Sequence, residues 1–186
     1  MINNTQSQKL YNLLINGKMV NQRQYDSKSN QLEENPLYNE LFTQLDEYSL
    51  LYRRIGYALV HKESSFFFIR ELAGEESNEA AIKVQALFII IGRYMTEKGY
   101  LFEVLSDYRA GLAPENLAMI SAEERYLDIL QTCKLCKSRT VEEELDNHLV
   151  NRGLMFKNSR GNYVLSEAGL GFFNELTEAY TGSIEA

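Results

Sequence analysis

The residues best suited to chemistry are the two cysteines, which form the motif Cys133-Lys-Leu-Cys136. Two thiolates at this spacing can supply half of a structural zinc site or act as a redox pair. A structural zinc ion needs four ligands, and the only histidines are His61 and His148. A redox pair is expected at a helix start near a strand, whereas these cysteines are predicted at a helix end. We therefore expect one packed and one incidental cysteine, with a zinc or redox protein as the alternative.

Other residue types that could support catalysis are not arranged for it. Glu142-Glu143-Glu144 falls on the first turn of a predicted helix, where negative charge favours the helix dipole. His148 is expected to lie partly exposed beside the core rather than to act as a base. Gly169 and Gly171 fall inside a predicted helix, so they do not form a phosphate-binding glycine loop. The sequence therefore predicts a protein that is not an enzyme and carries no metal or cofactor.

Several of these residues lie in a segment, from Thr140 onward, whose secondary structure the sequence predicts clearly. Thr140-Val-Glu-Glu143 is a capping box that predicts a helix start. Leu145 and Leu149 recur at helical spacing, and Gly153 falls where a helix ends in the left-handed conformation. This segment predicts one capped helix that ends at Gly153.

A hairpin and a second helix are predicted next. Two short apolar runs, residues 154–157 and 162–165, are joined by Asn158-Ser-Arg-Gly161, whose residue types favour a hairpin turn. A helix is expected from Ser166, with Phe172, Phe173 and Leu176 on its apolar side. The order of helix, glycine, hairpin and helix is typical of a winged helix-turn-helix. A generic helical domain with one hairpin is the alternative.

Basic residues gather between the end of one predicted helix and the tip of the hairpin. They are Lys134, Lys137, Arg139, Arg152, Lys157 and Arg160. A winged helix presents its recognition helix and wing to the same DNA surface, so these residues could contact phosphates together. Residues 142–144 and Asp146 place acid on the same helix, which argues against specific base reading. Weak phosphate contact beside other DNA-binding subunits and simple solvated surface charge both fit this pattern.

The first seventy residues resemble the same pattern in degenerate form. Residues 5–8 predict a capping box, residues 18–22 a short strand, and residues 23–34 a polar loop. Asn35-Pro36 predicts a new helix, with a break at Asp46 and a stop at Gly56. Two strands, residues 57–62 and 66–70, follow around Glu63-Ser-Ser65. We therefore predict a mainly α protein with small β-hairpin wings (α+β), built from tandem winged helix-turn-helix domains.

A long apolar helix is predicted between the two patterns. Ser77 is its expected cap, Gly99 its end, and apolar residues cover most sides of its middle. It is expected to bridge the two domains, to lie in a subunit interface, or both. Residues 100–120 are hard to interpret, and a capping box at residues 121–124 predicts another helix. The expected organisation is an N-terminal winged-helix domain (1–76), a linking helical segment (77–120) and a C-terminal winged-helix domain (121–186).

Composition limits the function classes. The net charge of −7 over 186 residues argues against a protein that depends on nonspecific attraction to phosphate. The longest apolar run, residues 86–91, is far shorter than the roughly 20 residues of a membrane span. No secretion signal is read, and two cysteines without one indicate the reducing cytoplasm.

Several segments together are similar to a known family. They are Leu14-Ile-Asn-Gly-Lys-Met-Val20, Asn35-Pro-Leu-Tyr-Asn-Glu-Leu41, Tyr52-Arg-Arg-Ile-Gly-Tyr-Ala-Leu59, Phe66-Phe-Phe-Ile69, Leu149-Val-Asn-Arg-Gly-Leu154, Tyr163-Val-Leu-Ser-Glu-Ala-Gly169 and Phe172-Phe173. They resemble the MksE/MukE-type kite subunit of bacterial MukBEF-like SMC condensins over nearly the whole chain. The resemblance implies a tandem winged-helix subunit that dimerises and binds a kleisin, which joins the heads of an SMC-type ATPase acting on DNA. It leaves chromosome organisation and plasmid defence equally open, and it implies a nucleoid-associated cytoplasmic protein.

Surplus apolar residues predict the association surfaces. The candidates for a homodimer or kleisin interface are Tyr57, Phe66, Phe67, Phe68, Phe88 and Ile91. In a hairpin with alternating faces, Phe66 and Phe68 point one way and Phe67 the other, so one face would pack on helices and the other on a partner. The competing functional hypothesis is a stand-alone winged-helix transcriptional regulator. Acid on the expected recognition helix favours the condensin subunit.

Overall fold

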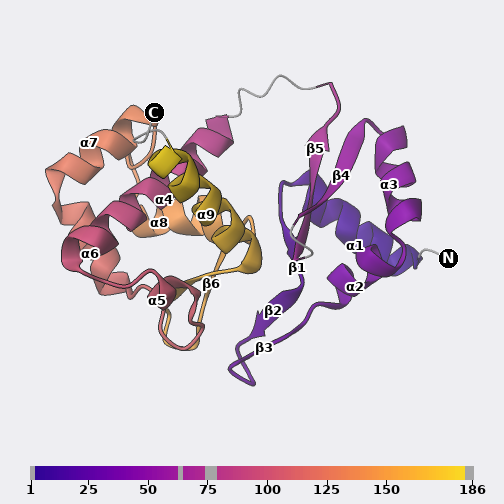
Figure 1. Ribbon diagram of the computed structural model, residues 1–186, viewed down its shortest axis with the longest axis horizontal. Helices are drawn as coiled ribbons and strands as arrows, with labels where there is room; N and C mark the ends of the chain where they lie inside the picture. Colours follow the sequence, from indigo (N-terminus) through magenta and orange to yellow (C-terminus); the bar gives the residue numbers. More distant parts are fainter. Residues whose placement is uncertain (1–2, 63–64, 74–78, 183–186) are drawn as a thin grey trace. The chain divides into compact units, whose positions relative to one another are not determined.

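The structure is a computed structural model that describes residues 3–62, 65–73 and 79–182. By its internal contacts the chain divides into two compact units, Met1–Glu76 and Ser77–Ala186. Both combine helices with short antiparallel strands, which confirms the prediction of a mainly helical α+β protein (Figure 1). No helix in the described part of the chain is both long and apolar enough to cross a membrane.

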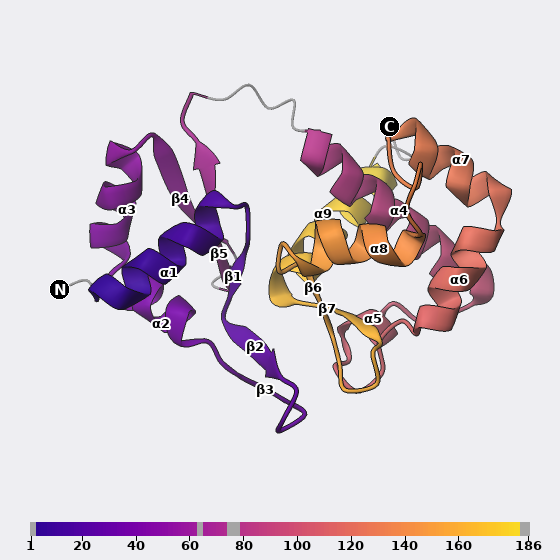
Figure 2. The ribbon, with the colours of Figure 1, turned by 180° about the vertical axis from the view of Figure 1, so that it is seen from behind.

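The first unit packs three helices on one side of a small sheet (Figures 1 and 2). Its elements are α1 (Asn4–Ile15), β1 (Val20–Asn21), β2 (Arg23–Asp26), β3 (Gln31–Glu34), α2 (Pro36–Thr43), α3 (Leu45–Arg54), β4 (Tyr57–Lys62) and β5 (Phe66–Glu71). The antiparallel sheet has the strand order β1-β5-β4. Its core consists of Leu10, Leu14, Val20, Tyr38, Leu41, Tyr48, Tyr52 and Phe67.

Local signals placed several boundaries of the first unit correctly. The Asn35 side chain accepts a hydrogen bond from the Leu37 N–H at 3.0 Å, with Pro36 beginning α2. Gly56 has a φ of +89°, so it occupies the left-handed position predicted to stop α3. The predicted turn after β4 falls partly on residues 63–64, which lie outside the described residues.

Three predictions for the first unit were wrong. The break between the two helices falls at Gln44 rather than at Asp46, because α2 ends at Thr43 and α3 begins at Leu45. Asn3, not Thr5, caps α1, and its Oδ1 accepts hydrogen bonds from the N–H groups of Thr5 and Gln6. Residues 23–34 form the hairpin β2–β3 rather than a loop. Its turn is made by polar chemistry, because the Asp26 carboxylate accepts the Lys28 and Ser29 N–H groups and Asn30 takes a φ of +55°.

The second unit surrounds the long helix α4 with shorter helices and a hairpin. Its elements are α4 (Glu79–Lys98), α5 (Glu103–Ser106), α6 (Pro114–Ala122), α7 (Glu124–Thr132), α8 (Val141–Leu145), the π-helical turn η1 (Asp146–Val150), β6 (Met155–Lys157), β7 (Tyr163–Leu165) and α9 (Glu167–Gly182). An isolated bridge joins Leu112 to the β6–β7 hairpin, because Leu112 and Tyr163 exchange two backbone hydrogen bonds of 2.8 Å. The order is therefore Leu112-β7-β6.

The capped helix and its hairpin appear as predicted. The Thr140 hydroxyl accepts the Glu143 N–H at 3.2 Å, and the Glu143 carboxylate accepts the Thr140 N–H at 2.8 Å. Gly153 ends the helix with a φ of +74°. The sequence did not predict the π-helical turn. From Asp146 the backbone hydrogen bonds span five residues instead of four, and the Asn151 N–H donates to the Asp146 carbonyl at 2.9 Å.

Other expectations for the second unit need correction. Ser121 belongs to α6, where its hydroxyl donates to the Leu117 carbonyl, and Glu123 occupies the cap position of α7. The middle of α4 is not covered on all sides, because Ile82 and Ile89 are about half exposed. Ser77, the predicted cap of α4, lies outside the described residues.

Candidate nucleic-acid and partner surfaces

The cysteine motif forms a tight turn after α7 rather than a reactive site. Lys134 and Cys136 both have positive φ, at 61° and 52°, and Leu135 between them is buried. The Cys136 N–H donates to Glu144 Oε1 at 3.0 Å. Burial, helped by the negative charge of Glu144, raises the pKa of the Cys136 thiol to about 11. A thiol that stays protonated is a poor nucleophile and metal ligand.

The described residues contain no metal-binding cluster around these cysteines either. Among the described residues, no three side chains of His, Cys, Asp or Glu come together in a group that could hold a metal ion. The two cysteines are both free thiols, Cys136 buried and Cys133 partly exposed. Cys136 is therefore a packed side chain, and Cys133 is a partly exposed thiol near it.

A buried carboxylate organises this turn, and sequence reasoning missed it. Glu144 is 5% exposed although its neighbour Glu143 lies in solvent. Besides the Cys136 N–H, it faces His148 Nε2 at 3.3 Å and an Arg139 guanidinium nitrogen at 4.0 Å. Burial lowers the pKa of His148 despite the opposing charge of Glu144. The spacing of Glu144 and His148, four residues apart on a helix, was the available signal.

The lysine of the predicted wing is held by carboxylates of the capped helix. Lys157 Nζ lies 2.8 Å from Asp146 Oδ2 and 3.6 Å from Glu142 Oε1. The Tyr163 hydroxyl donates to the same two side chains, at 2.9 Å to Asp146 Oδ1 and 3.2 Å to Glu142 Oε1. Burial and these carboxylates raise the pKa of Tyr163 well above its ordinary value. Acid on the helix therefore neutralises the Lys157 charge and joins helix to hairpin.

The six basic candidates for DNA contact thus fall into two groups. Lys134 lies 3.5 Å from Glu79, and Lys157 and Arg139 face carboxylates as described above. Lys137, Arg152 and Arg160 make no ion pair with any described residue. Lys137 and Arg160 are exposed, and Arg152 is half-buried. The structure therefore leaves fewer uncompensated cations here than the sequence suggested.

Most of the aromatic interface candidates are interior residues. Phe67 belongs to the core against α1–α3, and Phe66 and Phe68 stack at 6.1 Å on the alternate side of β5. Phe88 meets Phe173 edge to face at 6.0 Å. Phe66, Phe88 and Ile91 are buried, while Phe68 and Tyr57 are partly exposed.

Exposed apolar side chains occur at other positions, which the sequence reasoning did not select. The largest exposed fractions belong to Phe42, Leu50, Leu72, Ile82, Ile89, Leu101 and Met119. Four apolar or aromatic residues of α3 and its C-terminal cap recur at helical spacing, but only two of them are buried, since Leu51 and Ile55 are 41% and 47% exposed. Tyr48 and Tyr52 occupy the core instead. Both pairs, Tyr48 with Tyr52 and Leu51 with Ile55, are spaced by four residues, so helical periodicity could not decide which pair is buried.

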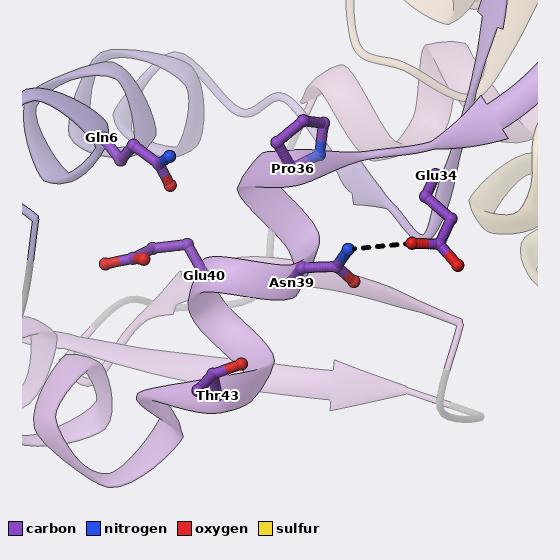
Figure 3. A pocket seen from close by; sticks show the side chains of 6 residues that line it. All are labelled: Gln6, Glu34, Pro36, Asn39, Glu40 and Thr43. Atoms are coloured by element: carbon purple, nitrogen blue, oxygen red, sulfur yellow. Dashed lines mark hydrogen bonds between the residues drawn. The ribbon is translucent and has the colours of Figure 1, made fainter.

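A polar hollow of about 380 Å³ lies in the first unit between α1, β3 and α2. Figure 3 shows its lining residues Gln6, Glu34, Pro36, Asn39, Glu40 and Thr43. Glu34 accepts a hydrogen bond from Asn39 Nδ2 at 3.3 Å, and Glu40 accepts from the Asn3 N–H at 3.0 Å and from the Tyr48 hydroxyl at 3.1 Å. These residues include no nucleophile paired with a base, so the hollow contains no catalytic arrangement.

Comparison with known proteins identifies the family to which the chain belongs. A search of curated proteins finds no match to this chain. Residues 5–177, which span both units, match the family described as "Condensin complex protein MksE". The match covers nearly the entire sequence, and the chain therefore belongs to the MksE family of condensin complex proteins.

Proposed function

We propose that this protein is a non-enzymatic accessory subunit, of the kite type, in a bacterial SMC condensin. It dimerises, binds the kleisin subunit, and through the kleisin associates with the SMC-type ATPase in the nucleoid of the cytoplasm. The observation that carries the proposal is the family match over residues 5–177. Chromosome organisation or segregation and plasmid defence are both processes that such a complex could serve.

The topology supports a tandem winged-helix architecture. In the first unit the short strand β1 follows α1, precedes α2 and α3, and pairs with the second strand of the later hairpin, in the order β1-β5-β4. In the second unit the Leu112 bridge takes the same place, in the order Leu112-β7-β6. In both, a helix ends at a glycine of positive φ immediately before the hairpin. This repeated plan is the one expected of two winged helices in one chain.

Exposed apolar side chains in both units support association. Large exposed apolar surfaces of soluble proteins usually mark interaction sites. Ile82 and Ile89, one face of α4, are 50% and 54% exposed, and Leu101 in the following segment is 71% exposed. A twofold dimer and an extended kleisin segment together would cover such surfaces.

DNA contact is proposed as weak and dependent on the complex. Lys137, Arg152 and Arg160 are its proposed residues, with Lys134, Arg139 and Lys157 contributing only where phosphate displaces their carboxylate partners. Changing Lys137 and Arg160 to glutamate should weaken DNA binding by the complex for all sequences alike. The log–log salt dependence should flatten by roughly one unit per lost contact. Unchanged affinity and slope would show that these charges are only solvated.

The proposal is tested by purifying the chain from its native host and identifying its companions by mass spectrometry. Stoichiometric kleisin and SMC subunits, with a dimeric mass by light scattering, are the expected result. A monomer that lacks these companions and binds one operator tightly at physiological salt would instead establish a transcriptional regulator. Such an operator binder should lose discrimination when one base pair of its site is changed.

A further inference from the structure

The turn of the β6–β7 hairpin is tied to a segment much earlier in the chain. Residues 107–112 and the β6–β7 turn lie side by side in both ribbon views (Figures 1 and 2). The buried Asn158 amide joins them, because its Nδ2 donates to the Tyr108 and Ala110 carbonyls, both at 3.1 Å. Its Oδ1 accepts the Arg160 N–H at 3.0 Å within the turn. We call this junction, residues 107–110 and 158–162, the hairpin tip.

The junction brings two arginines together. Arg109 stands between the two carbonyls that accept from Asn158, and Arg160 donates its N–H to the same side chain. Both arginine side chains are exposed, and neither forms an ion pair with a described residue. The Arg109 guanidinium carbon lies 5.3 Å from the centroid of the Tyr108 ring, and Arg109 Nε donates to the Tyr108 hydroxyl at 3.0 Å. Tyr108 therefore orients the Arg109 guanidinium, whose two terminal nitrogens are available to a ligand.

Most other cations of the second unit are compensated by carboxylates. Besides Lys134, Arg139 and Lys157, described above, the paired side chains are Lys83, Arg93, Lys98 and Arg125. Of the basic side chains without an ion pair to a described residue, Arg109 and Arg160 are held by one buried amide. Asp107, the only acid of the hairpin tip, accepts the Arg109 N–H at 2.9 Å and pairs with neither guanidinium. In a chain of net charge −7, the hairpin tip is therefore locally cationic.

We propose that the hairpin tip binds phosphate groups of a nucleic-acid backbone through Arg109 and Arg160. A guanidinium group can form two parallel hydrogen bonds with one phosphate. Asn158 fixes the backbone of both arginines and Tyr108 orients one of them, so little conformational freedom is lost on binding. The inference rests on the DNA contact of the proposed function and deepens it. It adds Arg109, which sequence reasoning did not select, and makes the hairpin tip, not the capped helix, the point of contact.

Other contact points and ligands fit these observations less well. The capped helix presents Glu142 and Asp146, which already hold Lys157 and would repel phosphate. A protein partner would need apolar side chains at the centre of its interface, and the hairpin tip exposes no large apolar side chain. A membrane surface would need an aromatic or aliphatic anchor, whereas the Tyr108 ring is half-buried beside Arg109.

Affinity for duplex DNA tests the two arginines. Fluorescence anisotropy with two duplexes of unrelated sequence is recorded over a range of salt, for the full chain and for the purified complex. Arg109→Ala and Arg160→Ala should each weaken binding by the full chain roughly tenfold near 0.1 M salt, and lower the log–log slope by roughly one unit, for both duplexes alike. Thermal unfolding checks that the variants are folded.

Arg93→Ala is the matched control. It removes the same charge from the same unit, but from an arginine whose Nε lies 2.9 Å from Glu97 Oε1, so DNA affinity should be unchanged. Equal losses in Arg93→Ala and Arg109→Ala would show an effect of net charge alone and overturn the proposal. Unchanged binding in both Arg109→Ala and Arg160→Ala, for the chain and for the complex, would also overturn it.

Photo-cross-linking tests which part of the second unit touches the DNA. A p-benzoylphenylalanine is placed at Ser159, exposed at the hairpin tip, or at Asn147, exposed on η1. Irradiation with duplex DNA should give more cross-linked DNA from position 159 than from position 147. An equal or higher yield from position 147 would assign the contact to the helix and overturn the hairpin tip.

Two further readouts separate this inference from its alternatives and from the proposed function. Loss of binding to phosphatidylglycerol vesicles in both arginine variants, with DNA binding unchanged, would overturn the nucleic-acid ligand and reassign the arginines to a lipid headgroup. Kleisin capture should be unchanged in both variants. Normal kleisin capture with unchanged DNA affinity would overturn the hairpin tip and leave the subunit assignment standing. An unmodified chain that captures no kleisin would defeat the subunit assignment, while DNA binding by the chain alone would still decide the hairpin tip.

Discussion

The two units follow one plan but stabilise their hairpins differently. Each hairpin comes after a helix that ends at a glycine of positive φ, Gly56 or Gly153. The first hairpin pairs six residues on each strand, and one of its faces joins the apolar core through Phe67. The second pairs only three residues on each strand. A short hairpin gains little from its own ladder, so it must be secured by its surroundings.

Polar side chains and close backbone packing secure the second hairpin. Lys157 and Tyr163 are tied to Asp146 of the preceding helix, and Asn158 is buried at its turn. Helix α9 approaches the chain before β6 so closely that a Cβ at Gly169 would lie 1.8 Å from the Leu154 carbonyl oxygen. Both buried polar or charged residues identified in the described chain, Glu144 and Asn158, belong to this unit. Similar topology can therefore rest on buried apolar area or on specific polar contacts.

The largest effect is expected from Gly169→Ala. The added methyl would collide with the Leu154 backbone, which cannot move without breaking the hairpin, so we expect a loss of about 3 kcal/mol or more. Hydrogen exchange should show the loss in the second unit and not in the first. Gly92→Ala is the matched control, because its Cβ would meet only side-chain atoms at ordinary contact distances, Phe173 at 3.4 Å and Phe102 at 4.0 Å. Normal stability of Gly169→Ala would show that close backbone packing does not stabilise the second hairpin.

Next in size is Asn158→Ala. The Asn158 amide donates to the Tyr108 and Ala110 carbonyls, both at 3.1 Å, and accepts the Arg160 and Asn162 N–H groups, both at 3.0 Å. Losing these hydrogen bonds in a buried site should lower the free energy of unfolding, measured by urea denaturation, by about 2–4 kcal/mol.

The counterpart in the first unit is Asn35→Ala. Asn35 makes two side-chain hydrogen bonds, to the Asn21 carbonyl at 2.9 Å and from the Leu37 N–H at 3.0 Å. Loss of this helix cap should cost about 1 kcal/mol. Equal costs for the two asparagines would show that the hairpins do not differ in their reliance on polar contacts.

A smaller effect is expected from the cysteine motif. Cys136→Ala should cost about 1–2 kcal/mol, because it removes one packed side-chain atom and leaves the hydrogen bond from its N–H to Glu144 intact. Cys133→Ala, at a partly exposed site, should cost less. Kleisin binding by the double variant should be unchanged, and chelator should not alter the unfolding of the unmodified protein. Metal-dependent folding would restore the zinc hypothesis for the second unit.

The smallest effect concerns pH, for which each unit carries one histidine. Burial lowers the pKa of both His61 and His148 from the ordinary value of 6.5. The folded state therefore favours the neutral imidazoles. Their contribution to the free energy of unfolding is complete above pH 6.5. Stability should fall as the pH drops below that value, because the unfolded chain takes up protons first, and level off below the folded pKa.

Single variants divide this pH dependence between the units. His148→Gln should flatten the profile of the second unit between pH 7.5 and 5.5, and His61→Gln that of the first, as followed by hydrogen exchange. This window lies above the titration of ordinary carboxyl groups. A profile that both variants leave unchanged would show that neither histidine is desolvated on folding.

Local chemistry in the sequence determined the starts and stops of several elements. The Thr140 capping box, Asn35-Pro36, and the glycines after α3, α4 and η1 act through contacts between residues near in sequence, so the pattern alone predicts them. The alternation that separates Phe67 from Phe66 and Phe68 is likewise a local property of an extended strand.

Tertiary structure decided which side chains these elements bury and which polar groups they pair with. Thr5 and Asn3 are both good caps, but the Asn3 N–H also reaches Glu40 at 3.0 Å, 37 residues away. Lys157 looked like a free wing cation until the fold placed it against Asp146, and Glu144 looked solvated until the cysteine turn covered it. In α3 two stripes fit the helical period, and only packing against the sheet selected Tyr48 and Tyr52 over Leu51 and Ile55. Such choices depend on residues distant in sequence, because burial and charge compensation are properties of the assembled core.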